Sequence, residues 1–272
     1  MTNSVYTIGL KNGEIHYPSG FDPETYSMFK YGDNKALKKY AFVVSNLIEE
    51  KLKDSISQPI VLICPSYWST PLAVSYLAKS IARILRARGF KNCSFVHIKG
   101  RNFSFNYHQI PITARKKVIR TALPYTISKR QIEKLKNSIV ILVDDIFITG
   151  SIVKMNKRLL NSLGVKNISV FTVAKCLPEV KKKYPKTIES IVNEAYVKSP
   201  EDLASLTNRP FWRLTTRSMR SLVFHSNFRE TKEAIKMMSA KTRNAFTQGI
   251  ISDGYDKIPE CARFAKKVLT YL

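Results

Sequence analysis

Two adjacent carboxylates followed by a small hydroxylated turn are the residues of this chain best suited to chemistry. Asp144 and Asp145 come directly after the apolar run of residues 139–143, and a Thr-Gly-Ser turn follows at residues 149–151. Carboxylates accept hydrogen bonds from hydroxyl groups. Backbone N–H groups at the start of a helix bind anions, most naturally a phosphate. The pattern therefore predicts a ligand with both vicinal hydroxyls and a phosphate, which is a sugar phosphate.

The segments around the acid pair indicate how it would be positioned. The run IVILV is apolar on both faces, which is typical of a buried central strand. Open α/β sheets bind ligands at the carboxyl ends of their strands. An amphipathic helix is predicted over residues 152–163 and closed by Gly164, and Gly150 before it lets the backbone approach a ligand closely. We therefore expect the acid pair at the rim of a crevice, beside a helix start.

Three other interpretations of the acid pair compete with this one. The magnesium-holding strand of P-loop NTPases also ends in acids, but it requires an upstream G-x-x-x-x-G-K-[ST] motif, which this chain lacks. Receiver domains carry paired acids at their first strand, whereas here more than a hundred residues precede the pair. A chance doublet that caps a loop is the third. Against it stands the whole run of strand, acids, spacer, Thr-Gly-Ser and helix.

The rest of the chain alternates strand and helix patterns, which predicts a parallel sheet in an α/β domain. Strands are predicted at residues 60–64, 93–98, 139–143 and 168–174, and a hairpin at 6–17 around the turn Asn12-Gly13. Helices are predicted at residues 34–53, 72–88, 114–123 and 152–163, and as helical runs at 187–197, 201–207, 228–246 and 259–271. We expect an N-terminal hairpin or hood segment (1–24), a core domain (25–177) and a helical C-terminal extension (178–272).

The charge balance points to a polyanionic partner. The chain has 45 basic and 20 acidic residues, a net charge of +25, and residues 81–138 hold 14 basic residues against one acidic residue. Such a region suits DNA or RNA, or a small ligand dense in phosphate, with the C-terminal extension as a second basic contact. A lysine-rich solvated surface is the alternative. Arg213, Arg217 and Arg220 would share one face of a helix, either as a nucleic-acid stripe or as an ordinary exposed face.

Other compositional features narrow the function classes. The cysteines form no C-x-x-C pair, which argues against a zinc site or a disulfide framework and favours a reducing compartment. The start of the chain lacks a signal-peptide pattern, and no apolar stretch approaches the roughly 20 residues that span a bilayer. The expectation is a cytoplasmic protein with no membrane partner.

The segment from Asp144 to Ser151 resembles the 5-phosphoribosyl 1-diphosphate-binding motif of type I phosphoribosyltransferases. Residues 25–41 (TYSMFKYGDNKALKKYA) and 112–123 (ITARKKVIRTAL) are similar to segments of the ComF-type, competence-associated members of that family, and residues 60–85 are placed like its diphosphate loop and following helix. The resemblance covers about residues 25–176. It implies the type I phosphoribosyltransferase fold, an α/β fold with a central, mostly parallel sheet flanked by helices, and leaves the mainly helical C-terminal extension unexplained.

The resemblance also implies a role for each part of the site. Asp144 and Asp145 would be the catalytic pair that holds the ribose hydroxyls. The 5′-phosphate would be bound by the residues Ile148, Thr149, Gly150, Ser151 and Ile152. The diphosphate would be bound by the residues Ser66, Tyr67, Trp68, Ser69 and Thr70. A flexible basic loop would add cations from Arg115, Lys116 and Lys117, or from Lys99 and Arg101. The expected cofactor is Mg²⁺, held mainly by the ligand, with Asp144 or Asp145 as its contact on the protein.

Two functions follow, from different classes. The first is a Mg²⁺-dependent phosphoribosyltransferase that moves phosphoribose between its diphosphate and a nucleobase-type acceptor. The second is a weakly active or inactive protein of the same fold that binds a nucleotide or nucleic acid in a regulatory, DNA-processing or defence role. Ile148 and Ile152 favour the second, because they stand where the family usually has threonine. Trp68 either stacks on a base or simply packs against its neighbours. The oligomeric state is left open, and a dimer is compatible with the sequence.

Overall fold

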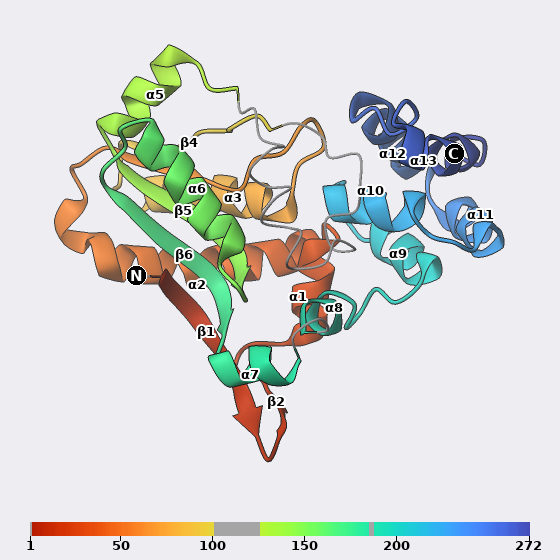
Figure 1. Ribbon diagram of the computed structural model, residues 1–272, viewed down its shortest axis with the longest axis horizontal. Coiled ribbons are helices and arrows are strands. Elements are labelled where there is room, and N and C mark those ends of the chain that lie inside the picture. Colours follow the sequence, from red (N-terminus) through yellow and green to blue (C-terminus); the bar gives the residue numbers. More distant parts are fainter. Residues whose placement is uncertain (1, 101–125, 185–187) are drawn as a thin grey trace.

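The computed structural model describes residues 2–100, 126–184 and 188–272, and its centre is one six-stranded sheet (Figure 1). The strands lie in the order β2-β1-β6-β5-β3-β4. Their bounds are Thr2–Lys11 (β1), Glu14–His16 (β2), Ile60–Ile63 (β3), Cys93–Phe95 (β4), Ile139–Phe147 (β5) and Ile168–Cys176 (β6). Every neighbouring pair is parallel except the hairpin β1-β2. The predicted α/β fold with a mostly parallel sheet is confirmed.

Helices cover both faces of the sheet, which explains why its central strands are apolar throughout. Helices α1 (Pro23–Lys30), α2 (Asn34–Leu52) and α3 (Ala73–Ala87) lie on one face, and α5 (Lys129–Lys136) and α6 (Ser151–Ser162) lie on the other (Figure 1). A short 3₁₀ turn, η1 (Lys53–Ser55), follows α2. Leu62 and Ile141 face the first group of helices, while Val61 and Leu142 face the second. All four are fully buried, as expected for a two-sided core.

The C-terminal third is helical and has an apolar core of its own. Its helices are α7 (Pro178–Lys183), α8 (Ile188–Asn193), α9 (Pro200–Thr207), α10 (Thr216–Val223), α11 (Phe228–Met237), α12 (Ala240–Ser252) and α13 (Pro259–Leu269). Helices α9 to α13, here called the helical bundle, lie together at one side of the molecule, with α10 closest to the sheet (Figure 1). Tyr31, after α1, is part of the same core, so the bundle is packed onto the sheet domain.

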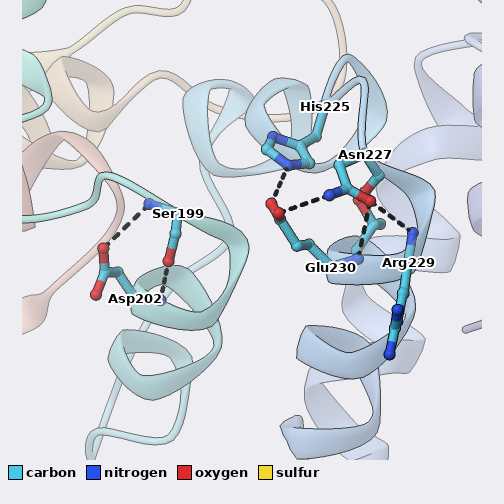
Figure 2. Close-up of polar contacts among 7 residues, drawn as sticks. Ser199, Asp202, His225, Asn227, Arg229 and Glu230 are labelled. Carbon is cyan, nitrogen blue, oxygen red and sulfur yellow. Dashed lines mark hydrogen bonds and ion pairs between the residues drawn. The ribbon is translucent and has the colours of Figure 1, made fainter.

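Side-chain caps fix where two bundle helices begin. Ser199 and Asp202 form a capping box at the start of α9 (Figure 2). The Asp202 carboxylate accepts the N–H groups of Lys198 (2.9 Å) and Ser199 (3.0 Å). At the start of α11, Asn227 Oδ1 accepts the N–H of Arg229 at 3.1 Å. Such caps satisfy the backbone donors that the first helical turn leaves unpaired.

Two predicted elements differ in the structure, and a third lies outside the described residues. The hairpin forms around Asn12-Gly13, both with positive φ, but its first strand also pairs in parallel with β6 and so belongs to the central sheet. The run predicted at 228–246 is two helices, because Ser239 caps a new start by accepting the N–H of Thr242. The short helix predicted at 114–123 lies outside the described residues. The division at residues 24 and 177 stays a prediction. No helix in the described part of the chain is long and apolar enough to cross a membrane.

Candidate functional site

The acid pair lies inside a strand and not in the loop after it. Strand β5 continues to Phe147, and Asp144 stands opposite Thr172 of β6 in the parallel ladder. The prediction that the strand ends at Val143 was therefore wrong, because pairing with β6 outweighs the low strand propensity of aspartate. The loop after β3 and the loop after β5 lie at the same edge of the sheet, since the two strands are parallel neighbours. That edge is where open α/β sheets bind ligands.

A lysine from the other end of the sequence pairs with the acid pair. Lys30, the last residue of α1, donates from Nζ to Asp145 Oδ2. Both side chains are largely buried, with 15% and 13% of their surfaces exposed. A carboxylate that is this buried needs a paired cation or hydrogen-bond donors to remain charged. Lys30 supplies that charge, and it belongs to the Lys-Tyr-Gly-Asp segment of the chain.

Asp144 has an environment that favours its neutral form. Burial, and then the charge of Asp145, raise the pKa of Asp144 to about 8, while Lys30 acts in the opposite direction. The Asp144 Oδ1 atom accepts the backbone N–H of Asp145 at 3.0 Å. The surroundings of Asp144 therefore favour its protonated form, while Lys30 pairs with Asp145.

Further polar side chains lie in the electrostatic range of the acid pair. Arg217 of α10 approaches Glu189 of α8 to 3.9 Å. Burial alone would lower the pKa of Arg217, but Tyr31 and Glu189 raise it. The Tyr26 hydroxyl is fully buried and has no hydrogen-bond partner among the described residues, and the charges of Asp145, Arg217 and Glu189 act on it. The buried Tyr26 hydroxyl is thus within electrostatic range both of the acid pair and of a cation of the helical bundle.

The turn after β5 has the geometry of an anion-binding helix start. Gly150 is the N-cap residue of α6 with φ 67° and ψ 14°, the left-handed region, and no side chain caps the helix there. A Cβ at this position would lie 2.5 Å from ring atoms of Phe147, so only glycine fits without a shift. The Thr149 and Ser151 hydroxyls are 3.0 Å apart and exposed. The structure thus brings residues 149–152 to the start of α6, two residues beyond the end of β5.

The two isoleucines of this turn have different surroundings. Ile148 is half-buried and packs against the apolar core below the sheet. Ile152 lies in the first turn of α6, and its carbonyl accepts from Asn156 Nδ2 at 2.8 Å. A threonine hydroxyl at 148 would therefore point toward the apolar core, whereas one at 152 would lie on the helix start.

The loop after β3 is held from several sides. The backbone N–H groups of Ser69 and Thr70 both donate to Asp253 Oδ1 of the bundle. Tyr67 is buried, and its ring stacks on that of His97 at a centroid distance of 3.9 Å. Trp68 is 38% exposed, and the Lys99 ammonium lies 4.2 Å from its ring centroid. That the ring stacks on a base or simply packs stays a prediction with two alternatives.

The predicted basic residues have different outcomes. The predicted basic residues 115–117 and Arg101 lie outside the described residues, while Lys99 lies next to the 66–70 loop. The predicted arginine face does not exist, because Arg213 precedes α10 and stacks on Tyr76, while Arg220 Nε donates to the Tyr255 hydroxyl at 2.6 Å. Among the described residues, no group of three His, Cys, Asp or Glu side chains could hold a metal ion.

Lys30, Asp253, Arg217 and Tyr26 are the residues near the site that sequence reasoning missed. Lys30 stood in a segment already noted for its resemblance to ComF-type proteins, so that segment was its only signal. Arg217 lies in α10, and Asp253 directly follows α12. Nothing in the sequence around either residue indicates a contact with residues 66–70 or with the acid pair.

An acid pair and a helix start without a side-chain cap thus lie at one edge of a mostly parallel sheet. The chain matches the family described as PRTase ComF-like over residues 2–262, and it belongs to that family. The match extends beyond the expected residues 25–176 on both sides, so the hairpin and most of the helical bundle are part of the family fold. No match was found among curated proteins.

Proposed function

We propose that this chain is a Mg²⁺-dependent phosphoribosyltransferase that binds 5-phosphoribosyl 1-diphosphate and transfers phosphoribose to a nucleobase-type acceptor. The observation that carries the proposal is the placement of Asp144 and Asp145 on β5, which leads through residues 146–149 to the left-handed Gly150 that opens α6. Carboxylates there accept the ribose hydroxyls, and the first N–H groups of α6 receive the 5′-phosphate. The family match supports the class of reaction but not the acceptor.

The reaction breaks the bond between the anomeric carbon and the diphosphate oxygen and forms a bond from that carbon to an acceptor nitrogen. Diphosphate leaves with the bonding electrons, and the acceptor nitrogen loses a proton. Positive charge develops on the sugar, so the nearby carboxylates stabilise it, and cations assist the leaving group. Lys99, beside the 66–70 loop, is the described cation best placed for that second role.

The donor set fits a magnesium ion that the protein does not enclose. No metal cluster exists among the described residues, and Mg²⁺ commonly keeps its waters and binds through one or two carboxylates plus substrate phosphates. Asp144 and Asp145 would provide that contact, and the ion would neutralise charge on the diphosphate. Because burial raises the pKa of Asp144, a bound ion would compete with the proton of that carboxyl.

Thermal unfolding with 5-phosphoribosyl 1-diphosphate and Mg²⁺ tests the proposal. A ligand at a hundred times its Kd stabilises the folded state by about 2.7 kcal/mol, which for a chain of this size is a rise in Tm of roughly 5–10 °C. The double variant Asp144→Asn with Asp145→Asn should lose this rise. The control Glu133→Gln changes an exposed acid that pairs only with Lys136 among the described residues, and it should keep the rise. No shift for the wild-type protein, or the same shift for both variants, refutes the proposal.

A second candidate function, nucleic-acid binding, is favoured by the surface formed by α5, α6 and Lys166. These two helices cover the same sheet face, and their only acidic residue is Glu133. Of the basic residues on this surface, only Lys136 has an acidic partner among the described residues. The basic residues are Lys129, Arg130, Lys134, Lys136, Lys154, Lys157, Arg158 and Lys166.

Salt-dependent mobility shifts with single-stranded DNA test this second function. Neutralising Lys134, Lys154 and Arg158 to glutamine should reduce the slope of log K against log salt by about two, because each phosphate contact contributes about 0.7. A control neutralises three exposed lysines outside this surface, Lys53, Lys182 and Lys241. Equal effects of both triple variants, or no binding at low salt, would exclude the α5–α6 surface as the nucleic-acid site.

A further inference from the structure

One carboxylate of the helical bundle is bonded to the predicted diphosphate loop. Asp253 ends α12, and its Oδ1 atom accepts the backbone N–H of Ser69 at 3.0 Å and that of Thr70 at 2.9 Å. Asp253 is only 5% exposed, while Ser69 lies at the surface. The contact therefore joins two parts of the chain 184 residues apart and directs two successive loop N–H groups into the bundle.

A second residue of the bundle holds the same segment from its carbonyl side. Thr216, the first residue of α10, donates its hydroxyl to the Thr70 carbonyl at 2.6 Å and its N–H to the Pro71 carbonyl at 2.9 Å. Donors and acceptors of residues 69–71 are thus paired with the bundle on both sides. A loop with paired backbone groups loses conformational freedom before any ligand arrives, which lowers the entropic cost of binding.

We propose that Asp253 is a positioning residue that fixes the 66–70 loop in its diphosphate-binding conformation, which makes the helical bundle part of the substrate site. For its ligand this inference rests on the proposed function. The N–H groups of Ser69 and Thr70 are used internally, and the buried Thr70 hydroxyl donates to the Met219 sulfur at 3.7 Å. The diphosphate is therefore bound by the remaining donors of the loop, namely the Ser66 and Ser69 hydroxyls and the backbone of residues 66–68. Their placement depends on the anchored residues beside them.

Two effects of Asp253 oppose each other, and two substitutions separate them. The anchor favours the diphosphate, while the negative charge of an ionised Asp253 repels it. Asp253→Asn keeps an Oδ1 acceptor for both N–H groups and removes the charge. Asp253→Ala removes both. A positioning role predicts that the alanine variant fails and the asparagine variant retains function.

Calorimetric titration with inorganic diphosphate plus Mg²⁺, and separately with ribose 5-phosphate, measures the two halves of the site. Asp253→Ala should weaken diphosphate binding at least about tenfold. A displaced loop loses at least one hydrogen bond to the charged diphosphate, and one such bond corresponds to a factor of about ten or more in affinity. Ribose 5-phosphate, which uses the acid pair and the start of α6, should bind as in the wild-type protein. Asp253→Asn should bind both ligands.

Asp202→Ala is the matched control for the loss of stability. Its carboxylate also accepts two successive backbone N–H groups in the same bundle, at the start of α9 and away from the 66–70 loop (Figure 2). It should unfold more easily than the wild-type protein and bind diphosphate normally. Amide hydrogen exchange at Ser69 and Thr70 should accelerate at least about tenfold in Asp253→Ala only, because the anchor protects those groups from exchange.

Different failures have different meanings. If Asp253→Ala and Asp253→Asn both strengthen diphosphate binding, Asp253 acts as a repelling charge and the inference is overturned. An equal loss of affinity for ribose 5-phosphate, or unchanged exchange at Ser69 and Thr70, also overturns it. If the wild-type protein binds neither ligand, the proposed function fails and the diphosphate role with it, while accelerated exchange in Asp253→Ala would still establish the anchor.

Discussion

Alanine at Gly150 should damage both stability and phosphate binding, whereas alanine at Gly164 should damage stability alone. The two glycines flank the same helix: Gly150 caps the start of α6, and Gly164 follows its last turn. Both have positive φ, 67° and 83°, which disfavours any residue with a Cβ. The pair therefore separates the cost of backbone strain from the effect on the helix start.

The size of each effect follows from the local geometry. The left-handed conformation costs a residue with a Cβ about 1–2 kcal/mol. Reduced freedom of the unfolded chain offsets about 0.4–1 kcal/mol of this. At Gly150 the new Cβ would also lie 2.5 Å from the half-buried Phe147 ring, whereas at Gly164 it would lie 3.2 Å from the flexible Lys136 chain. We expect a loss of about 1 kcal/mol for Gly164→Ala and about 2 kcal/mol for Gly150→Ala.

Urea unfolding measures the free energies, and calorimetric titration with ribose 5-phosphate measures the site. Gly150→Ala should lose at least about tenfold in affinity, because a displaced helix start weakens its hydrogen bonds to a charged phosphate. Gly164→Ala should bind with wild-type affinity. Equal affinity in both variants would show that the start of α6 is not the phosphate site. A Gly150→Ala protein as stable as the wild type would contradict the geometry of the turn itself.

Three other predictions concern the acid pair and the isoleucine of the first helical turn. Lys30→Met should lower the free energy of unfolding by about 2 kcal/mol. Removing one partner of a fully buried ion pair costs about 3–5 kcal/mol, and the effect is smaller here because the Lys30–Asp145 pair keeps some solvent contact. The double variant Lys30→Met with Asp145→Asn should regain part of the lost free energy of unfolding. The pKa of Asp144, about 8 in the folded state, lies above its ordinary 3.8, so the folded state holds a proton that the unfolded chain releases. As the pH rises between these two pKa values, the free energy of unfolding of the wild-type protein should fall relative to that of Asp144→Asn by up to about 1.4 kcal/mol per pH unit. Urea unfolding of both proteins at pH 5, 6, 7 and 8 measures this. The same dependence of the free energy of unfolding on pH in both proteins would contradict the prediction. Ile152→Thr should raise the affinity for ribose 5-phosphate by roughly tenfold or more by adding a donor at the start of α6, and an unchanged Kd in titration calorimetry would show that the hydroxyl does not reach the ligand.

The central sheet could be predicted from the sequence because its signal is local. The strands at β3, β5 and β6 are runs of apolar residues buried on both faces, and turn residues separate them from amphipathic helices. The bounds were less predictable. Asp144 and Asp145 disfavour a strand, yet β5 extends to Phe147 because its partner β6 continues alongside it. Ladder pairing with a distant segment overrides local propensity, and no single segment contains that information.

The sequence allowed about half of the candidate site to be predicted. The other half depends on contacts between residues that are far apart in the chain. The acid pair and the Thr-Gly-Ser turn are contiguous, so their spacing is visible in the chain. The Lys30–Asp145 pair joins residues 115 apart, and Asp253 meets a loop 184 residues away. A lysine at a helix end and an aspartate after a helix are ordinary surface residues in sequence terms. Only the packing of α1 and α12 against the sheet domain gives them their partners.

The two departures from the family pattern have unequal weight once their surroundings are compared. Ile148 packs against the apolar core under the sheet, where a threonine hydroxyl would need a buried partner. Isoleucine at this position therefore serves packing. Ile152 sits on the helix start itself, where a hydroxyl would add a donor. Of the two isoleucines, residue 152 therefore matters more for whether the protein catalyses phosphoribosyl transfer or only binds its ligand. The other determinant is how firmly the helical bundle holds the 66–70 loop.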